Sequence, residues 1–287
     1  MQVDLRKLRQ RCKMTKPPGV QVKPGLWYTD NKADILAVAH LDCIPRTKHF
    51  GVVRIIPGNY YIVYNGQLDD RLGVYTILDL LPALGVKYDI LLTTEEEKCN
   101  STARLFQADK VYKWIFSFDR AGRDVALYQY LNDATVQAVK SVNMQAAHGS
   151  YSDVVELEHL ECSAFNWGTG LVDGHYPTAH FSTRDYMSCV MSFLEFYNLY
   201  SAQRFAHEQQ FWPAHENIID LCDYCNQVSV LTEYDGFLIC EDCEGHVRES
   251  WLDECAHCGN ITTVEYLASH DAFLCAECAK QIIEWGV

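Results

Sequence analysis

Four short apolar runs, each followed by acidic or histidine residues, constrain the fold of this chain more than any other feature. The runs cover residues 34–39, 88–94, 113–118 and 162–167. Short stretches of β-branched and aromatic residues between helix-like segments are typical of buried strands in a parallel sheet. We therefore expect an α/β fold with a doubly wound mixed sheet. In open α/β sheets ligands bind beyond the carboxyl ends of the strands, so the polar residues that follow the runs should meet in one crevice.

These polar residues are of the types that bind metal ions or transfer protons. They are His40, Asp42, Glu95, Glu96, Glu97, Asp119 and His175, joined by Asp69 and Asp70 from the segment between the first two runs. Taken alone, each has an ordinary structural explanation. An acidic triple is usually a solvated helix face, an Asp-Asp pair is most often a helix N-cap, and a single histidine is more often hydrogen-bonded in a loop than bound to a metal. Their joint occurrence at predicted strand ends favours a metal site.

The order of these motifs resembles that of the co-catalytic di-zinc aminopeptidases and their deacylase relatives, in a compact form similar to tripeptide aminopeptidases and small phage-encoded relatives. The resemblance covers roughly residues 30–203. It rests on His40-Leu41-Asp42 and on segments 66–73, 95–97, 117–122, 149–153 and 166–170, the last of which is followed five residues later by His175. It implies a di-metal hydrolase domain of the zinc-peptidase type.

The resemblance also implies a role for each residue. Two metal ions would share Asp69 as a bridging ligand. The ligands are His40, Asp69 and Asp119 for one ion and Asp69, Glu97 and His175 for the other. Glu96 would be the general base, and Asp42 would orient His40 by accepting a hydrogen bond from its far ring nitrogen. Two zinc ions, or cobalt or manganese in their place, would lie about 3.5 to 4 Å apart, polarise the substrate carbonyl and activate water.

One departure from the family pattern leaves two candidates for the last ligand. Relatives usually carry a glutamate four residues after the last histidine, and here Ala179 stands at that place while a second histidine, His180, follows it. Aligning His180 as the ligand would put it ahead of Ser182 and Asp185, as in other branches of the family. We favour His175, because the Gly-Thr-Gly register fits without gaps. His180 would then bind substrate or stabilise an oxyanion.

Eight of the thirteen cysteines lie in the last 66 residues and are spaced as in zinc sites. They are Cys222, Cys225, Cys240, Cys243, Cys255, Cys258, Cys275 and Cys278. A two-residue spacer lets a tight turn direct two thiolates at one tetrahedral ion. We expect a small cysteine-rich double zinc-ribbon domain that binds two structural zinc ions, with redox or disulfide cysteines as the alternative. Spacing leaves open whether each repeat completes its own site or the pairs cross over.

The other cysteines lack metal-site spacing, and we expect them to be structural. They are Cys12, Cys43, Cys99, Cys162 and Cys189. The sequence contains neither an apolar signal-peptide run near its start nor a stretch long enough to span a membrane. So many cysteines without these signals indicate reduced thiols and a cytoplasmic location.

The cysteine-rich segment is strongly acidic. Residues 211–287 contain 15 Asp plus Glu against only Arg248 and Lys280, whereas residues 1–210 are close to neutral. An acidic domain repels nucleic acid, so phosphate-backbone binding is not expected of it. A basic protein surface, a neighbouring subunit or the enzyme's own substrate is the expected partner.

The motifs also divide the chain. We expect an N-terminal helix and lead-in at 1–30, with the helix over Leu5–Met14, a di-metal hydrolase domain at 31–210 and the acidic zinc-binding domain at 211–287. The short separation of His40 from Asp69 leaves no room for a large inserted lid. The function expected is hydrolysis of an amide bond in a peptide or small amide, most simply by a di-zinc aminopeptidase. The alternatives are a deacylase or amidohydrolase acting on a non-peptide amide, and an inactive hydrolase scaffold that binds proteins through its zinc-ribbons.

Overall fold

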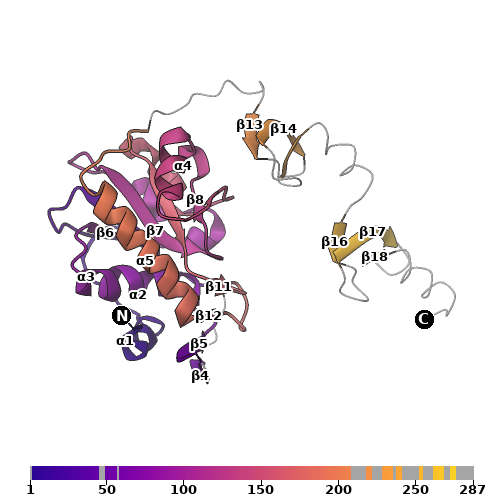
Figure 1. The fold of residues 1–287 in the computed structure, drawn as a ribbon, viewed down its shortest axis with the longest axis horizontal. Coiled ribbons are helices and arrows are strands. Elements are labelled where there is room, and N and C mark those ends of the chain that lie inside the picture. Colours follow the sequence, from indigo (N-terminus) through magenta and orange to yellow (C-terminus); the bar gives the residue numbers. More distant parts are fainter. Residues whose placement is uncertain are drawn as a thin grey trace. The chain divides into compact units, whose positions relative to one another are not determined.

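The computed structural model describes residues 2–44, 49–56 and 58–207, together with the backbone of six strands between residues 218 and 275 (Figure 1). The chain divides into two compact units, residues 1–210 and 211–287, which are described separately. Among the described helices there is none long and apolar enough to cross a membrane.

An eight-stranded mixed sheet forms the centre of the first unit (Figure 1). In spatial order its strands are β1 (Val20–Lys23), β2 (Leu26–Thr29), β6 (Asp89–Thr93), β3 (Ile35–His40), β7 (Trp114–Arg120), β10 (Ala164–Gly168), β8 (Val125–Ala126) and β9 (Ala146–Ala147). The four middle strands, β6, β3, β7 and β10, are parallel, and they correspond to the four apolar runs of the sequence. Strands β2 and β8 pair antiparallel with β6 and β10. The α/β class and the mixed sheet predicted from the sequence are therefore confirmed.

Both faces of the sheet are buried. Ile35, Ala37 and Ala39 of β3 lie in one core cluster, and Leu36 and Val38 lie in a second one. Side chains of a strand point alternately to its two faces, so every residue of β3 is buried. This burial explains why the strand has a continuous apolar run instead of an alternating pattern.

The two faces are covered by different kinds of helix. The first core cluster includes residues of α1 (Leu5–Arg11), α2 (Leu68–Tyr75), α4 (Asp133–Lys140) and α5 (Thr183–Tyr200). A π-helical turn (Thr76–Leu80) and α3 (Leu81–Ala83) continue α2. The second cluster includes residues of three 3-10 segments, Thr102–Leu105, Tyr128–Tyr130 and Asp153–Leu160. The sheet is thus doubly wound, with α-helices on one face and short 3-10 turns on the other.

Helix α5 closes the first unit. Its N-cap is Ser182, whose hydroxyl accepts a hydrogen bond from the backbone N–H of Asp185 at 3.4 Å. A serine at this position satisfies one of the unpaired donors at the start of a helix. Phe193 and Phe196, three positions apart on one helix face, both contact Trp114 of β7 through edge-on aromatic pairs. These contacts anchor the helix on the sheet.

The N-terminal residues are an integral part of the first unit. The predicted helix over Leu5–Met14 is shorter than expected, because α1 ends at Arg11 and the chain then forms turns in which Met14 N–H donates to the carbonyl of Arg11. Arg11 pairs with Asp79 in the π-helical turn, with Nε to Oδ2 at 2.6 Å. Strands β1 and β2 extend the sheet at one edge. The lead-in therefore supplies both an edge of the sheet and a helix.

A second, smaller sheet lies in the first unit. Its strands are, in order, β11 (Leu171–Val172), β12 (His180–Ser182), β5 (Tyr60–Tyr64) and β4 (Gly51–Ile55), all antiparallel. The hairpin β4–β5 belongs to the segment between His40 and Asp69, where the sequence leaves no room for a large lid. The sheet joins this hairpin to residues that follow β10.

The described strands of the second unit form two three-stranded sheets. Strands β13 (Ile218–Leu221), β14 (Val228–Tyr234) and β15 (Phe237–Cys240) form one antiparallel three-stranded sheet. Strands β16 (Leu252–Glu254), β17 (Ile261–Leu267) and β18 (Ala272–Cys275) form another. Cys240 and Cys275 occupy the last position of equivalent strands, and only their backbone is described. The other six predicted zinc ligands lie outside the described residues: Cys222, Cys225, Cys243, Cys255, Cys258 and Cys278.

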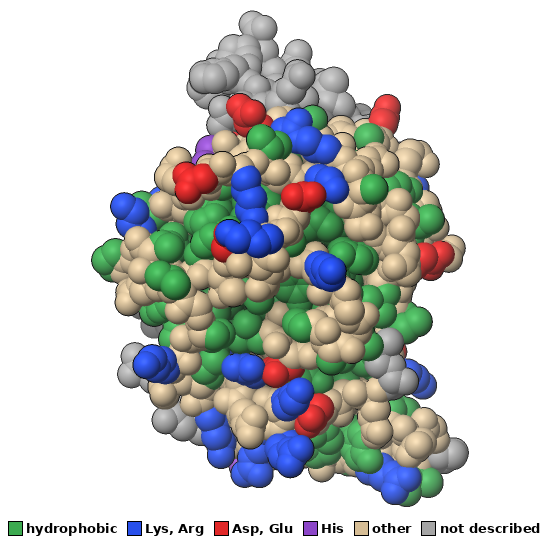
Figure 2. Space-filling model, turned by 90° about the vertical axis from the view of Figure 1, so that its left-hand side faces the viewer, with side chains coloured by type: hydrophobic (Ala, Val, Ile, Leu, Met, Phe, Trp, Pro, Cys, Tyr) green, Lys and Arg blue, Asp and Glu red, His purple; other side chains and the backbone are tan. Residues whose placement is uncertain are grey.

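Charge is distributed unevenly over the chain. Figure 2 shows one face of the molecule, on which Lys and Arg side chains gather toward the lower edge. The N-terminal segment carries exposed Arg6, Lys7, Arg9 and Lys13. The net charge of the whole chain is −14, and residues 211–287 hold 15 acidic residues against only Arg248 and Lys280. The excess of acidic residues therefore lies largely in 211–287.

Candidate metal centre

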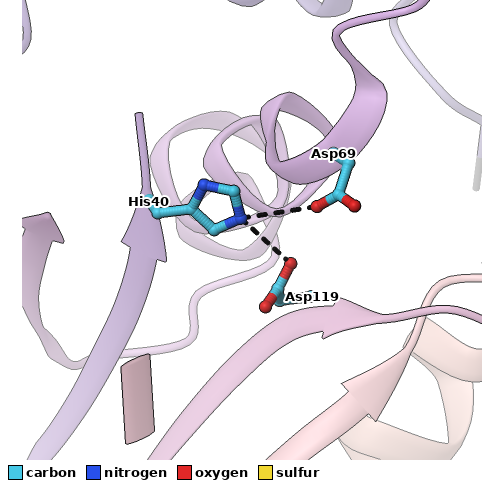
Figure 3. A group of neighbouring side chains, drawn as sticks. All are labelled: His40, Asp69 and Asp119. Atoms are coloured by element: carbon cyan, nitrogen blue, oxygen red, sulfur yellow. Dashed lines mark ion pairs between the residues drawn. The ribbon is translucent and has the colours of Figure 1, made fainter. Parts of the chain in front are cut away.

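Three predicted ligands meet at the carboxyl end of the central strands (Figure 3). His40 is the last residue of β3, Asp119 lies near the end of β7, and Asp69 lies at the start of α2. The Nε2 atom of His40 is 3.4 Å from Asp69 Oδ1 and 3.3 Å from Asp119 Oδ1. The His40 side chain is only 1% exposed, and its Nε2 has no hydrogen-bond partner. An imidazole nitrogen buried between two carboxylates suits a metal ion.

A second group shares Asp69 with the first. It consists of Asp69, Glu97 and His175, whose candidate ligand atoms all lie within 4.8 Å of one another. The Nε2 atom of His175 is 3.2 Å from Asp69 Oδ2 and 3.6 Å from Glu97 Oε2. One oxygen of Asp69 thus faces His40 and the other faces His175. This is the arrangement that a carboxylate needs in order to bridge two metal ions.

The carboxyl groups of the centre are buried close together, so positive charge would stabilise their ionised form. Burial raises the pKa of Asp119 to about 7, with the neighbouring Asp69 adding to the effect and His40 opposing it. Burial and the nearby Asp119 raise the pKa of Glu96 to about 9. The pKa of His175 is raised because its ring bonds to Asp69. Divalent cations would relieve this crowding of carboxylates, because opposite charge stabilises the ionised acids. The donor set therefore fits metal ions.

The ring of His40 lies beside Asp42. Its Nδ1 lies 3.0 Å from the backbone carbonyl of Asp42, and 3.6 Å from the carboxylate Oδ1 of the same residue. Asp42 is thus the acceptor for the far ring nitrogen of His40, and its backbone carbonyl is closer to that nitrogen than its carboxylate is. Either acceptor requires the proton on Nδ1 and leaves Nε2 free for a metal.

The acidic triple is a tight turn and not a helix face. Glu96–Lys98 form a single 3-10 turn, and Glu95 just before it has a φ of +67°. The turn directs Glu96 and Glu97 inward, where their side chains are 12% and 7% exposed, whereas that of Glu95 is 43% exposed and pairs with Lys98. The solvated-face alternative thus holds for Glu95 alone.

Glu96 lies beside the metal groups without belonging to either. Its Oε2 atom is 3.7 Å from Nε2 of His40. It is absent from both candidate ligand sets among the described residues. This position suits a proton-transferring group more than a ligand.

Asp70 caps the helix that carries Asp69. Its Oδ1 accepts a hydrogen bond from the backbone N–H of Gly73 at 2.9 Å, and its side chain is buried. Regular helical dihedral angles begin only after Asp70, and the peptide bond between Asp69 and Asp70 is cis. Asp70, and not Asp69, thus makes the side-chain hydrogen bond typical of a helix N-cap, while Asp69 faces the histidines.

The two candidate histidines lie in different environments. His175 follows Gly174, where an added Cβ would lie 2.8 Å from Asp69 Oδ2, so the absence of a side chain allows the loop to approach the Asp69 carboxylate. His180 is in β12, where its Nδ1 lies 3.0 Å from the carbonyl of Thr178 and its ring stacks on Tyr64 at 5.2 Å. The geometry places His175, and not His180, in the second ligand group.

Several supporting residues had no role in the sequence analysis. The side-chain oxygen of Asn166 accepts a hydrogen bond from the backbone N–H of Asp119 at 3.0 Å. The hydroxyl of Ser152 donates to Asp119 Oδ2 at 3.2 Å. Buried Asp153 accepts hydrogen bonds from two further hydroxyls. All three lie in segments that carry the family resemblance, and this location was the one sign in the sequence that they could support the site. Their partners could not be predicted, because they are distant in sequence.

Neither a protein-family model nor a curated protein matches the sequence. The solved structures to which this chain is similar include three at low sequence identity. PhTET1-12s, a dodecamer, is 11% identical, with 67% of this chain and 98% of that chain covered and a TM-score of 0.46. A tripeptidase from Staphylococcus aureus is 10% identical, with 62% and 84% covered and a TM-score of 0.45. The aminopeptidase PepT from Bacillus cereus is 10% identical, with 67% and 91% covered and a TM-score of 0.44.

The first unit is a mixed α/β fold with two metal-type ligand groups that share one aspartate.

Proposed function

We propose that this chain is a metal-dependent amide-bond hydrolase, and most simply a di-zinc aminopeptidase. One observation carries the proposal: the two oxygens of Asp69 face two different imidazoles, and each of these imidazoles has a second carboxylate beside it. A shared carboxylate between two such groups is the ligand pattern of two-metal hydrolases.

Each proposed ion has three protein ligands. They are His40, Asp69 and Asp119 for the first ion and Asp69, Glu97 and His175 for the second. Three protein ligands leave a position for substrate or water. Two divalent ions bound here would polarise the amide carbonyl and lower the pKa of the attacking water. Zinc is the first choice, with cobalt or manganese as alternatives.

Glu96 is the proposed general base. It is largely buried beside His40, and it is free of both ligand groups. Its carboxylate would take the proton of the attacking water and pass it to the leaving amine, work that typically contributes about 100- to 10,000-fold in rate. The surrounding acids raise the pKa of Glu96, and bound cations would lower it again and keep the base ionised at neutral pH.

The choice among amide substrates rests on the resemblance of the motifs. It favours peptides with a free amino terminus, with a deacylase or amidohydrolase as the second candidate. An inactive adaptor is the less favoured alternative, because the base and a candidate for every ligand position are present and close together.

The second unit is proposed to bind two structural zinc ions through its eight spaced cysteines. Its two three-stranded halves support an internal repeat, as expected for a double zinc-ribbon. We further propose a protein partner for this acidic unit and a cytoplasmic location, where thiols stay reduced.

Hydrolysis of a substrate panel tests the function. The full chain loaded with zinc would be offered aminoacyl anilides with free amino groups and the same compounds with acetylated amino groups. Cleavage of the free-amine series alone, lost on chelation and restored by zinc, is the expected result. Release of acetate from the acetylated series, with the anilide bond left intact, would make the chain a deacylase. Absence of cleavage in either series by fully loaded protein would favour the adaptor.

A further inference from the structure

Glu96 and Glu97 lie on a loop whose shape is not favoured by its own sequence. The loop leaves β6 at Thr93 and ends at Ser101. Glu95 and Cys99, on either side of the 3-10 turn, have φ angles of +67° and +51°. Residues with side chains seldom adopt this left-handed conformation, and they keep it only where the surrounding structure holds them.

One buried carboxylate holds both ends of this loop. Oδ2 of Asp153 accepts a hydrogen bond from the hydroxyl of Thr93 at 2.7 Å, and Oδ1 accepts one from the hydroxyl of Ser101 at 2.5 Å. The side chain of Asp153 is almost completely buried. Hydrogen bonds between hydroxyls and a buried carboxyl group gain strength away from water.

The loop is also closed at its base by direct bonds between its flanks. The backbone N–H of Thr102 donates to the carbonyl of Thr94 at 2.9 Å, and the hydroxyl of Thr102 accepts from the N–H of Thr94 at 3.0 Å. The two flanks of the loop are therefore held together at its base by hydrogen bonds that do not involve Asp153. The two bonds of Asp153 fix the loop against the 3-10 segment Asp153–Leu160, which covers the second face of the sheet.

The residue before Asp153 reaches a different ligand. The hydroxyl of Ser152 donates to Asp119 Oδ2 at 3.2 Å, and it accepts from the side-chain amide of Asn166 at 3.3 Å. Asp119 belongs to the first ligand group, whereas Glu97, on the loop that Asp153 bonds at both ends, belongs to the second. Two consecutive residues thus support the two groups separately.

We propose that Asp153 is a positioning residue for the second metal site and for the base, acting through Thr93 and Ser101, and that Ser152 positions the first metal site through Asp119. This inference rests on the proposed function, since it assumes that the two ligand groups bind metal. It assigns no contact between Asp153 and the metal ions or the substrate.

Metal affinity measured one site at a time tests the proposal. The full chain, with zinc in its cysteine sites and the catalytic pair removed by mild chelation, would be titrated with Mn²⁺, and free Mn²⁺ would be followed by electron paramagnetic resonance. Manganese suits carboxylate-rich sites and not thiolates. His175→Ala leaves only the first site intact, and Asp119→Asn leaves only the second. Asp153→Ala and Ser152→Ala would be made in each background.

The two changes should act on opposite sites. Asp153→Ala should weaken Mn²⁺ binding by about 10- to 100-fold in the Asp119→Asn background, and by less than about 3-fold in the His175→Ala background. Ser152→Ala should do the reverse with a smaller effect. Asp153→Asn should restore most of the affinity, because an amide can still accept from one hydroxyl and donate to the other. Thermal unfolding of each variant provides the control for the fold.

Three outcomes would contradict the proposed positioning role of Asp153. They are equal weakening of both sites by Asp153→Ala, no weakening of either site, and an Asp153→Asn variant as weak as Asp153→Ala. A parent protein that keeps zinc in its cysteine sites and binds no Mn²⁺ would instead overturn the proposed function, so the two failures are distinguishable.

Discussion

The backbone N–H of Glu97 donates a hydrogen bond to Oδ2 of Asp42 at 3.2 Å, which ties the loop after β6 to the loop after β3. Asp42 also lies beside the ring of His40, so this one residue contacts a member of each ligand group. The Asp42 carboxylate accepts a hydrogen bond from Glu97 of the second group, whereas the backbone carbonyl of Asp42 is the closer acceptor for His40. The two candidate ligand groups are thus connected through Asp42 as well as through the shared Asp69.

Glu96→Gln should reduce turnover by at least about 100-fold while metal content stays near that of the parent protein, because a neutral amide cannot accept the water's proton. Glu97→Gln is the matched control one residue away, and it should lower metal affinity as well as turnover. Steady-state kinetics with elemental analysis would measure both. Near-normal turnover of Glu96→Gln would remove this residue from the role of base.

His175→Ala should lose one catalytic metal ion and nearly all activity. His180→Ala should keep both ions, because His180 lies outside the two ligand groups. If His180 stabilises an oxyanion, its loss should lower kcat with a free-energy cost of about 3 to 4 kcal/mol. Elemental analysis of the two variants decides the point, and loss of an ion only from His180→Ala would exchange the two assignments.

Protein with all of its proposed sites occupied should contain four divalent metal ions per chain, two in the cysteine sites and two in the carboxylate and imidazole groups. The pair held by carboxylates and imidazoles should be removed first by a chelator, since open sites exchange faster than closed thiolate sites. Elemental analysis during timed chelation would show two steps. A plateau of two ions in fully loaded protein would eliminate one of the two kinds of site.

Asp89→Asn should destabilise the first unit at neutral pH. Burial alone would raise the pKa of Asp89, but its bonds to Lys110, Tyr28 and Tyr112 outweigh burial and hold the pKa below its usual value. The substitution should lower the free energy of unfolding by about 2 kcal/mol, as for hydrogen bonds to charged groups.

The pH dependence of this effect has a definite sign. A carboxyl group with a lowered folded-state pKa stabilises the protein above its unfolded pKa of about 3.9, and the stabilisation is lost as pH falls through the folded value. The difference between Asp89→Asn and the parent should therefore be constant near neutral pH and shrink below about pH 4. Denaturant unfolding at several pH values would measure it, and a difference that grows on acidification would contradict the assignment.

Residues 211–287 expressed alone should not bind DNA tightly, since 15 acidic residues face only Arg248 and Lys280 in this segment. Titration of a labelled duplex at two salt concentrations is a direct measurement. Tight binding that weakens steeply with salt would refute the charge argument.

The sequence determined the middle of the sheet. Each of the four central strands needs apolar residues on both faces, and this requirement leaves a continuous run that can be identified without a structure. The ends of parallel strands meet at one edge, so the ligand types that follow the runs were also predictable. His40 and Asp119 lie where this argument puts them.

Only the tertiary structure decided which polar groups face one another. His175 and His180 are five residues apart and chemically alike, and their difference arises because Gly174 lets one loop approach Asp69 while β12 pairs His180 into the small sheet. The same holds for Asp153, whose partners Thr93 and Ser101 are more than 50 residues away in sequence. Such contacts depend on how distant segments pack, and local sequence patterns carry no record of that packing.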